Sequence, residues 1–136
     1  MKHLVEARGL DHTFLIDSAG IGRWHVGQLP DRRMRTCGAR HGYQFDSRAR
    51  QFCADDFGRF DLIVAMDDEN RHDLLRQARS EADRSKVVMM ADYLRRHPAQ
   101  RIIPDPYYGD ERDFELVIAL LEDACATLLD TLTNGR

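Results

Sequence analysis

The segment that most constrains the fold is the apolar run Asp61-Leu62-Ile63-Val64-Ala65-Met66. Its apolar residues occupy both faces of an extended chain, which is typical of an interior parallel strand, because helices cover such a strand on both sides. Asp67-Asp68-Glu69 follows at once and supplies an acidic first turn that complements the dipole of a helix, with Asp67 most simply its N-cap. A strand followed directly by a helix predicts an α/β layer with a parallel sheet.

Two further segments complete the expected sheet. Residues 14–19 predict a short buried strand that ends in polar residues, and residues 86–90 predict a third buried strand. The expected helices lie between and beyond these strands, over residues 1–9, 31–41, 54–60 as a single short turn, 67–79 and 110–132. In the last of them Cys125 falls on the apolar face. Sites in such folds gather at the carboxyl ends of the strands.

The expected helix at residues 1–9 has no evident beginning. No Ser, Thr, Asp or Asn caps it, and it is shorter than the roughly 12 to 15 residues that an isolated helix needs for stability. We therefore expect that a segment preceding it is missing.

Length and charge limit the classes of protein to be considered. The chain of 136 residues fits one domain, residues 1–136. It has 20 basic and 23 acidic residues, intermixed, which argues against nucleic acid or an anionic membrane as its main partner. The chain has neither a run of about eighteen apolar residues nor a signal peptide, so we expect a cytoplasmic protein. The three cysteines fit reduced thiols.

The strongest candidate site is the loop Pro104-Asp105-Pro106-Tyr107-Tyr108-Gly109. Each proline fixes its own φ and extends the residue before it, so Asp105 is expected in a nearly fixed geometry. A rigid carboxylate beside aromatic rings suits proton transfer to an aromatic leaving group. The alternative is a polar turn whose tyrosines pack on a helix. Trp24, in a glycine-bounded loop, is either a lid beside a site or an anchoring ring.

Other motifs are rejected. Cys53-x5-Arg59 has the spacing of a phosphate-binding loop of cysteine phosphatases, but a strand follows it rather than precedes it, and two aspartates within it would repel phosphate. The six histidines show no His-x3-His spacing, and the cysteines show no Cys-x2-Cys spacing, so we expect neither a metal nor a cofactor.

With these residues in view, the chain resembles the low-molecular-weight protein tyrosine phosphatases. The resemblance implies a three-layer, doubly wound parallel sheet, normally of four strands. It rests on motifs that follow one another in family order: Asp17-Ser18-Ala19-Gly20, Trp24-His25-Val26-Gly27, Pro30-Asp31-Arg32, Arg40-His41-Gly42, Arg48-Ala49-Arg50-Gln51, Phe60-Asp61-Leu62-Ile63, Ala65-Met66-Asp67 and Asp105-Pro106-Tyr107-Tyr108-Gly109.

The resemblance also implies a mechanism and a gap. In the family a cysteine thiolate attacks the phosphorus of phosphotyrosine, and the aspartate matching Asp105 protonates the phenolate and then activates water. Trp24, Tyr107 and Tyr108 match residues that line the mouth of the cleft, and Ser18 matches a serine that braces the phosphate loop. Family members carry an interior strand and a Cys-x5-Arg-Ser loop before the first helix. We therefore expect an N-terminally truncated chain without nucleophile, inactive as written.

Three interpretations remain open. The first is a phosphatase of phosphotyrosine proteins or small aryl phosphates whose sequence is shortened. The second is a natural pseudo-phosphatase that acts as a binding or regulatory protein, and the third is a relative such as an arsenate reductase, for which Cys37, Cys53 and Cys125 form no suitable redox set.

A missing interior strand would leave unpaired backbone groups and exposed apolar surface on its neighbours. We then expect marginal stability, or a homo-oligomer in which a second copy fills the gap.

Overall fold

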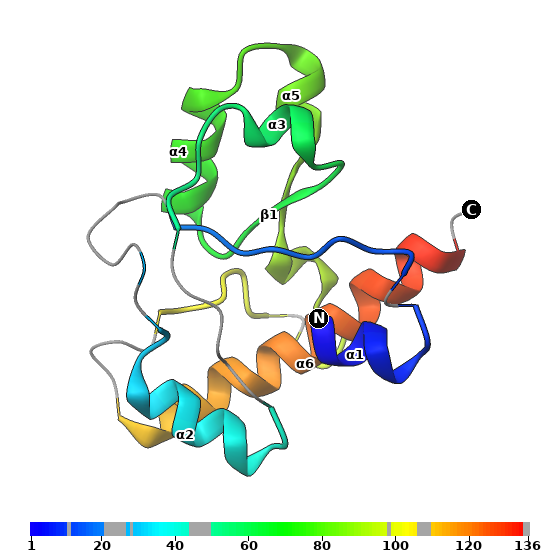
Figure 1. Ribbon diagram of the computed structural model, residues 1–136. Coiled ribbons are helices and arrows are strands. Elements are labelled where there is room, and N and C mark those ends of the chain that lie inside the picture. The colour runs from blue at the N-terminus through cyan, green and yellow to red at the C-terminus, as the bar shows by residue number, and fades with distance from the viewer. Residues whose placement is uncertain are drawn as a thin grey trace.

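The computed structural model describes residues 1–10, 12–20, 27, 29–43, 50–97, 99–105 and 110–134, the side chains of Glu111 and Asn134 excepted. Figure 1 shows the order of the elements along the chain. They are α1 (Lys2–Ala7), α2 (Arg32–Arg40), α3 (Asp56–Arg59), β1 (Ile63–Ala65), α4 (Asp68–Gln77), α5 (Glu81–Ser85), β2 (Val87–Met89), the 3-10 helix η1 (Met90–Tyr93) and α6 (Glu111–Asn134).

The sheet of the described residues has two parallel strands. Ile63 of β1 lies opposite Val87 of β2, and Ala65 lies opposite Met89. The prediction of parallel strands over residues 61–66 and 86–90 is thus confirmed, with both strands shorter than expected. A sheet of four strands, and the absence of one of them, remain predictions.

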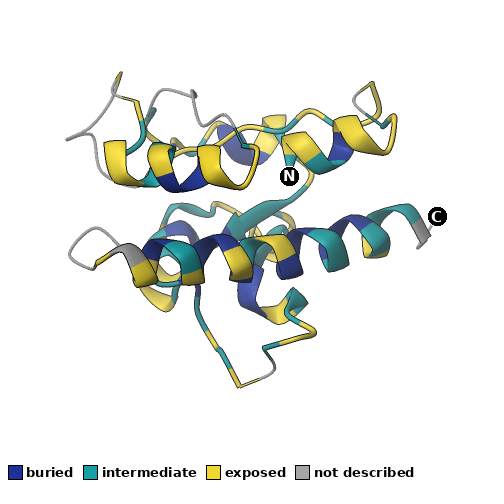
Figure 2. Ribbon diagram, turned by 90° about the horizontal axis from the view of Figure 1, so that it is seen from below, coloured by how far each residue is buried: buried dark blue, intermediate teal, exposed yellow. Residues whose placement is uncertain are grey.

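Successive residues of β1 face two different apolar clusters. Val64 packs against the cluster built on α6, in which Leu120 and Ala124 are fully buried, whereas Ala65 belongs to a second cluster with Leu74 of α4. The sheet is therefore covered by α6 on one side and by α3 and α4 on the other, as the two-faced apolar pattern predicts. Figure 2 shows buried residues along the length of α6, with α1 and α2 lying alongside it.

The expected strand at residues 14–19 is wrong. This segment has no strand assignment, and its end makes one isolated parallel bridge, in which the N–H of Gly20 donates to Arg50 O at 2.8 Å and the N–H of Phe52 donates to Gly20 O at 2.7 Å. Leu15 is 79% exposed. The apolar composition of residues 14–19 predicted a buried strand. Among the described residues, however, no strand lies beside this segment to pair with it or cover it.

The ends of the helices follow local sequence signals. Met1 is the N-cap residue of α1 and provides no side-chain cap, as expected, and Gly9 beyond the end of the helix has φ 69°. Asp67 caps α4 by accepting a hydrogen bond from Asn70 N at 2.8 Å, which confirms its expected role. α5 was not predicted from the sequence, although the Ser80 hydroxyl caps it by accepting a hydrogen bond from Asp83 N. No helix in the described part of the chain is long and apolar enough to cross a membrane.

Candidate active site

The loop that carries Asp105 starts at the carboxyl end of β1. Ile103 is 3% exposed, and its N–H donates to the carbonyl oxygen of Met66 at 2.7 Å, directly after the strand. Asp105 follows two residues later with an exposed side chain. Asp105 is thus two residues from a point anchored beside the carboxyl end of β1, the end of a parallel sheet at which sites gather. Trp24, Tyr107 and Tyr108 lie outside the described residues.

The segment that carries Ser18 is held by an ion pair between Asp17 and Arg50. Ser18 is exposed, and its N–H donates to Asp17 Oδ1 at 2.8 Å. Arg50 Nε donates to the other oxygen of the same carboxylate, Asp17 Oδ2, at 2.9 Å. Because Arg50 also joins the bridge at Gly20 through its backbone, it fixes this segment at two points. The backbone around Ser18 is therefore held in place by these contacts, while the Ser18 side chain is exposed.

Arg50 also reaches a buried carboxylate. Asp56 is 1% exposed, and its Oδ2 accepts hydrogen bonds from an Arg50 guanidinium nitrogen at 3.0 Å and from Cys53 N at 2.9 Å. Burial raises the pKa of Asp56, but the hydrogen bonds from Cys53 and Arg50 outweigh it, so the pKa lies below its ordinary value. Asp56 thereby occupies the N–H that a phosphate loop at Cys53 would need, which supports the rejection of Cys53-x5-Arg59.

Two of the three cysteines are buried and unlike activated nucleophiles. Cys37 and Cys125 are buried, and Cys53 is exposed. Burial raises the pKa of the Cys37 thiol, and its hydrogen bond to Glu115 raises it further. A catalytic cysteine needs a lowered pKa and an electropositive, accessible setting, so the buried thiols do not fit that role.

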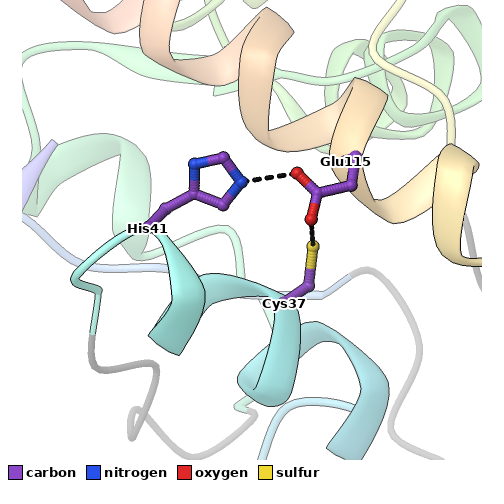
Figure 3. Close-up of side chains that lie close together, drawn as sticks. All are labelled: Cys37, His41 and Glu115. Atoms are coloured by element: carbon purple, nitrogen blue, oxygen red, sulfur yellow. Dashed lines mark hydrogen bonds and ion pairs between the residues drawn. The ribbon is translucent and has the colours of Figure 1, made fainter.

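A further polar cluster joins α2 to α6 (Figure 3). The thiol of Cys37 donates to Glu115 Oε1 at 3.0 Å, and His41 Nε2 lies 2.5 Å from Glu115 Oε2. A guanidinium nitrogen of Arg40 lies 3.3 Å from Glu115 Oε1. Hydrogen bonds from Cys37 and His41 hold the pKa of Glu115 below its usual value. Sequence reasoning missed this cluster, although Cys37-x3-His41 places both residues on one side of a helix.

The family profile described as low molecular weight phosphotyrosine protein phosphatase matches residues 1–136. The chain belongs to this family. A candidate low molecular weight protein-tyrosine-phosphatase of Synechocystis sp. is 45% identical over 132 residues, which cover 97% of the chain and 83% of that relative. The low molecular weight phosphotyrosine protein phosphatase of Gallus gallus is 36% identical over 130 residues, covering 95% of the chain and 81% of that relative.

Solved structures agree with this membership of the phosphatase family. The crystal structure of protein tyrosine phosphatase from Entamoeba histolytica superposes with a TM-score of 0.92 at 39% identity, covering 98% of the chain and 85% of that structure. The α/β fold is therefore that of the family, and the resemblance drawn from the sequence motifs is confirmed. The missing strand and missing phosphate loop remain predictions.

Besides Asp56, this phosphatase family member has a second buried carboxylate, which lies on α6. Asp123 is 9% exposed, and its oxygens accept hydrogen bonds from Arg96 N at 2.8 Å, from Arg95 N at 3.2 Å and from His97 Nδ1 at 3.2 Å. Burial raises the pKa of Asp123, but the N–H of Arg96, the His97 ring and the N–H of Arg95 outweigh it and leave the pKa below its ordinary value. Asp123 thus attaches the chain after η1 to α6.

Proposed function

We propose that this protein takes part in the hydrolysis of phosphotyrosine and other aryl phosphate monoesters, with Asp105 as the general acid. The observation that carries the proposal is membership in the phosphatase family along the whole chain. A second support is the hydrogen bond from Ile103 to Met66, which ties the start of the Asp105 loop to the end of β1. A proton donor must be held within reach of the departing oxygen, and an anchored loop meets that need.

The proposed reaction has two steps. A cysteine thiolate attacks phosphorus, the bond to the phenolic oxygen breaks, and Asp105 gives its proton to that oxygen. Asp105, now a carboxylate, takes a proton from water as the water attacks the phosphocysteine, which releases phosphate and restores the thiolate. The proposed contacts of the aromatic ring are Trp24, Tyr107 and Tyr108, which match such residues in the family, and the proposed brace of the phosphate-binding loop is Ser18. The exposure of Ser18 on an Arg50-anchored segment supports the bracing role.

The nucleophile is not one of the three cysteines of this chain. Support comes from the buried settings of Cys37 and Cys125, and from the use of the Cys53 N–H by Asp56. We therefore propose that these 136 residues supply the acid and, by themselves, do not catalyse phosphocysteine-dependent hydrolysis. Loss of the nucleophile in a covalent mechanism costs about 10⁶-fold, which a proton donor worth about 10²- to 10⁴-fold cannot restore.

The test compares the chain with an extended version. The extension adds, before Met1, a strand and a Cys-x5-Arg-Ser loop of the family type. We expect negligible metal-free hydrolysis of an aryl phosphate by the 136 residues and clear turnover by the extended protein. In the extended protein Asp105→Asn should lower kcat by about 10²- to 10⁴-fold, and less for substrates whose leaving group needs no proton. Turnover by the 136 residues at an enzymatic rate would contradict the proposed inactivity.

The substrates, the cellular location and the partners of this protein are also proposed from its family membership. Phosphotyrosine proteins or small aryl phosphates are the proposed substrates, the proposed location is the cytoplasm, and nucleic acid is not a proposed partner. The relatives above are named as phosphatases, so the pseudo-phosphatase alternative gains no support from them.

A further inference from the structure

The Cys37, His41 and Glu115 side chains converge from two helices in a way that the phosphatase reaction does not use. Cys37 and His41 are four residues apart on α2 and its C-terminal cap, so both point to one side, where Glu115 of α6 meets them (Figure 3). The Sγ, imidazole nitrogen and carboxylate oxygen all lie within 4.8 Å of one another. Thiolate, imidazole and carboxylate are the ligands that zinc takes in proteins.

We propose that Cys37, His41 and Glu115 form a Zn²⁺ site that fastens α2 to α6. Three ligands of one tetrahedral zinc ion lie about 3.5 Å apart. The Glu115 oxygens already lie 3.0 Å from Cys37 Sγ and 2.5 Å from His41 Nε2, so Glu115 has to draw back slightly to admit the ion, while Sγ and the imidazole nitrogen stay within the 4.8 Å that the three ligand atoms span. The His41 and Glu115 side chains are 34% and 39% exposed, which leaves them room to turn and leaves the ion a path inward. Water completes the fourth position, because the described residues give three ligands.

Metal binding rearranges protons and one ion pair. The Cys37 thiol loses its proton to solvent as the S–Zn bond forms, and His41 coordinates as the neutral ring. Two anionic ligands then balance the charge of the ion. Arg40 competes for the site, because its guanidinium pairs with Glu115 Oε1 at 3.3 Å. Removing Arg40 should therefore strengthen zinc binding, an effect that no merely structural role of the cluster predicts.

Cobalt(II) is the probe for the ligand set, and a chromophoric chelator measures competition for Zn²⁺. We expect the purified protein to bind a single Zn²⁺ and to show, with Co²⁺, a thiolate-to-metal charge-transfer band. Cys37→Ser should abolish the band, and His41→Gln or Glu115→Gln should weaken zinc binding by more than the about 10- to 100-fold that loss of an outer-shell partner costs. Arg40→Gln should tighten it.

Cys53→Ser is the matched control, because Cys53 is an exposed thiol outside the cluster. It should leave the band and the affinity unchanged. His41→Gln keeps the test valid if the buried Cys37→Ser variant fails to fold, since His41 is partly exposed. The proposal is overturned if no metal binds, if the band survives in Cys37→Ser, or if Cys53→Ser removes it.

Discussion

Arg50 pairs with a carboxylate that the fold has taken out of water. Asp56 is 1% exposed, and Arg50 donates a hydrogen bond to it at 3.0 Å. Breaking a buried pair by removing one partner costs about 3–5 kcal/mol, because the remaining charge stays buried. We therefore expect Arg50→Met to lower the free energy of unfolding at pH 7 by about that amount, measured by urea denaturation.

Arg59 provides the matched comparison. Its guanidinium lies 3.7 Å from Asp56 Oδ1, but its side chain is 65% exposed, so Arg59→Met should cost less than about 1 kcal/mol.

The contribution of Asp56 to stability depends on pH with a fixed sign. Since the folded pKa of Asp56 lies below its unfolded value of about 3.9, the stabilisation is complete above that value and is lost as the pH falls through the folded pKa. Equal losses in the two variants would contradict this assignment.

Single residues were predictable where their role is local. The role of Asp67 at a helix start follows from the residues beside it and is confirmed, whereas the fixed geometry expected of Asp105 between two prolines stays a prediction. Asp56 and Glu115 were not predictable in their observed roles. Cys37 meets Glu115 across 78 positions of sequence, and no local spacing encodes such a meeting.

Among the elements, α6 holds the backbone of the chain that follows η1 through the buried carboxylate of Asp123. Asp123 accepts the N–H groups of Arg95 and Arg96 and contacts the His97 ring. In Asp123→Asn the neutral amide loses the charge-assisted hydrogen bonds and turns a donor toward donors. We expect a loss of about 1.5–3 kcal/mol in the free energy of unfolding at pH 7. Hydrogen exchange at Arg95 and Arg96 should accelerate, which NMR can follow.

Asp130→Asn on the same helix is the control. Asp130 pairs with Arg8 at 2.6 Å and lies 3.8 Å from the Arg95 guanidinium, but these side chains are 34% to 65% exposed and no backbone N–H of the segment is involved, so we expect a loss of at most about 1 kcal/mol. The folded pKa of Asp123 is lowered, so its contribution is present above the unfolded pKa of about 3.9 and fades as the pH falls through the folded value. A penalty for Asp123→Asn that stayed constant into strong acid would argue against this role.

Elements with a periodic or two-faced pattern were predictable, and those defined by tertiary pairing were not. The long helix α6 and the strands β1 and β2 follow from their apolar spacing. Residues 14–19 have the composition of a strand, yet a strand exists only where a neighbour pairs with it, and the described chain offers only the bridge at Gly20. The short α5 carries its cap at Ser80, a signal too local to stand out beside the longer helices.

At the scale of the whole molecule, the layered architecture was predictable because β1 is apolar on both faces. Val64 and Ala65 pack into different clusters, one with α6 and one with α4, as a doubly covered sheet requires. The number of strands is a different matter, since it depends on every segment that pairs. Among the described residues, no strand pairs with the edge of β1 that faces away from β2.

That open edge determines the stability expected of the 136 residues. Two paired strands of three residues each and a Leu15 side chain that is 79% exposed leave backbone groups and apolar surface to water. We expect a free energy of unfolding below the about 5–15 kcal/mol usual for a domain, with association that increases with concentration. Urea denaturation and sedimentation velocity measure both. If an added strand pairs with this edge of β1, the extended version should be more stable and monomeric. A dilute 136-residue monomer of ordinary stability, unchanged by the extension, would show that the edge is already satisfied.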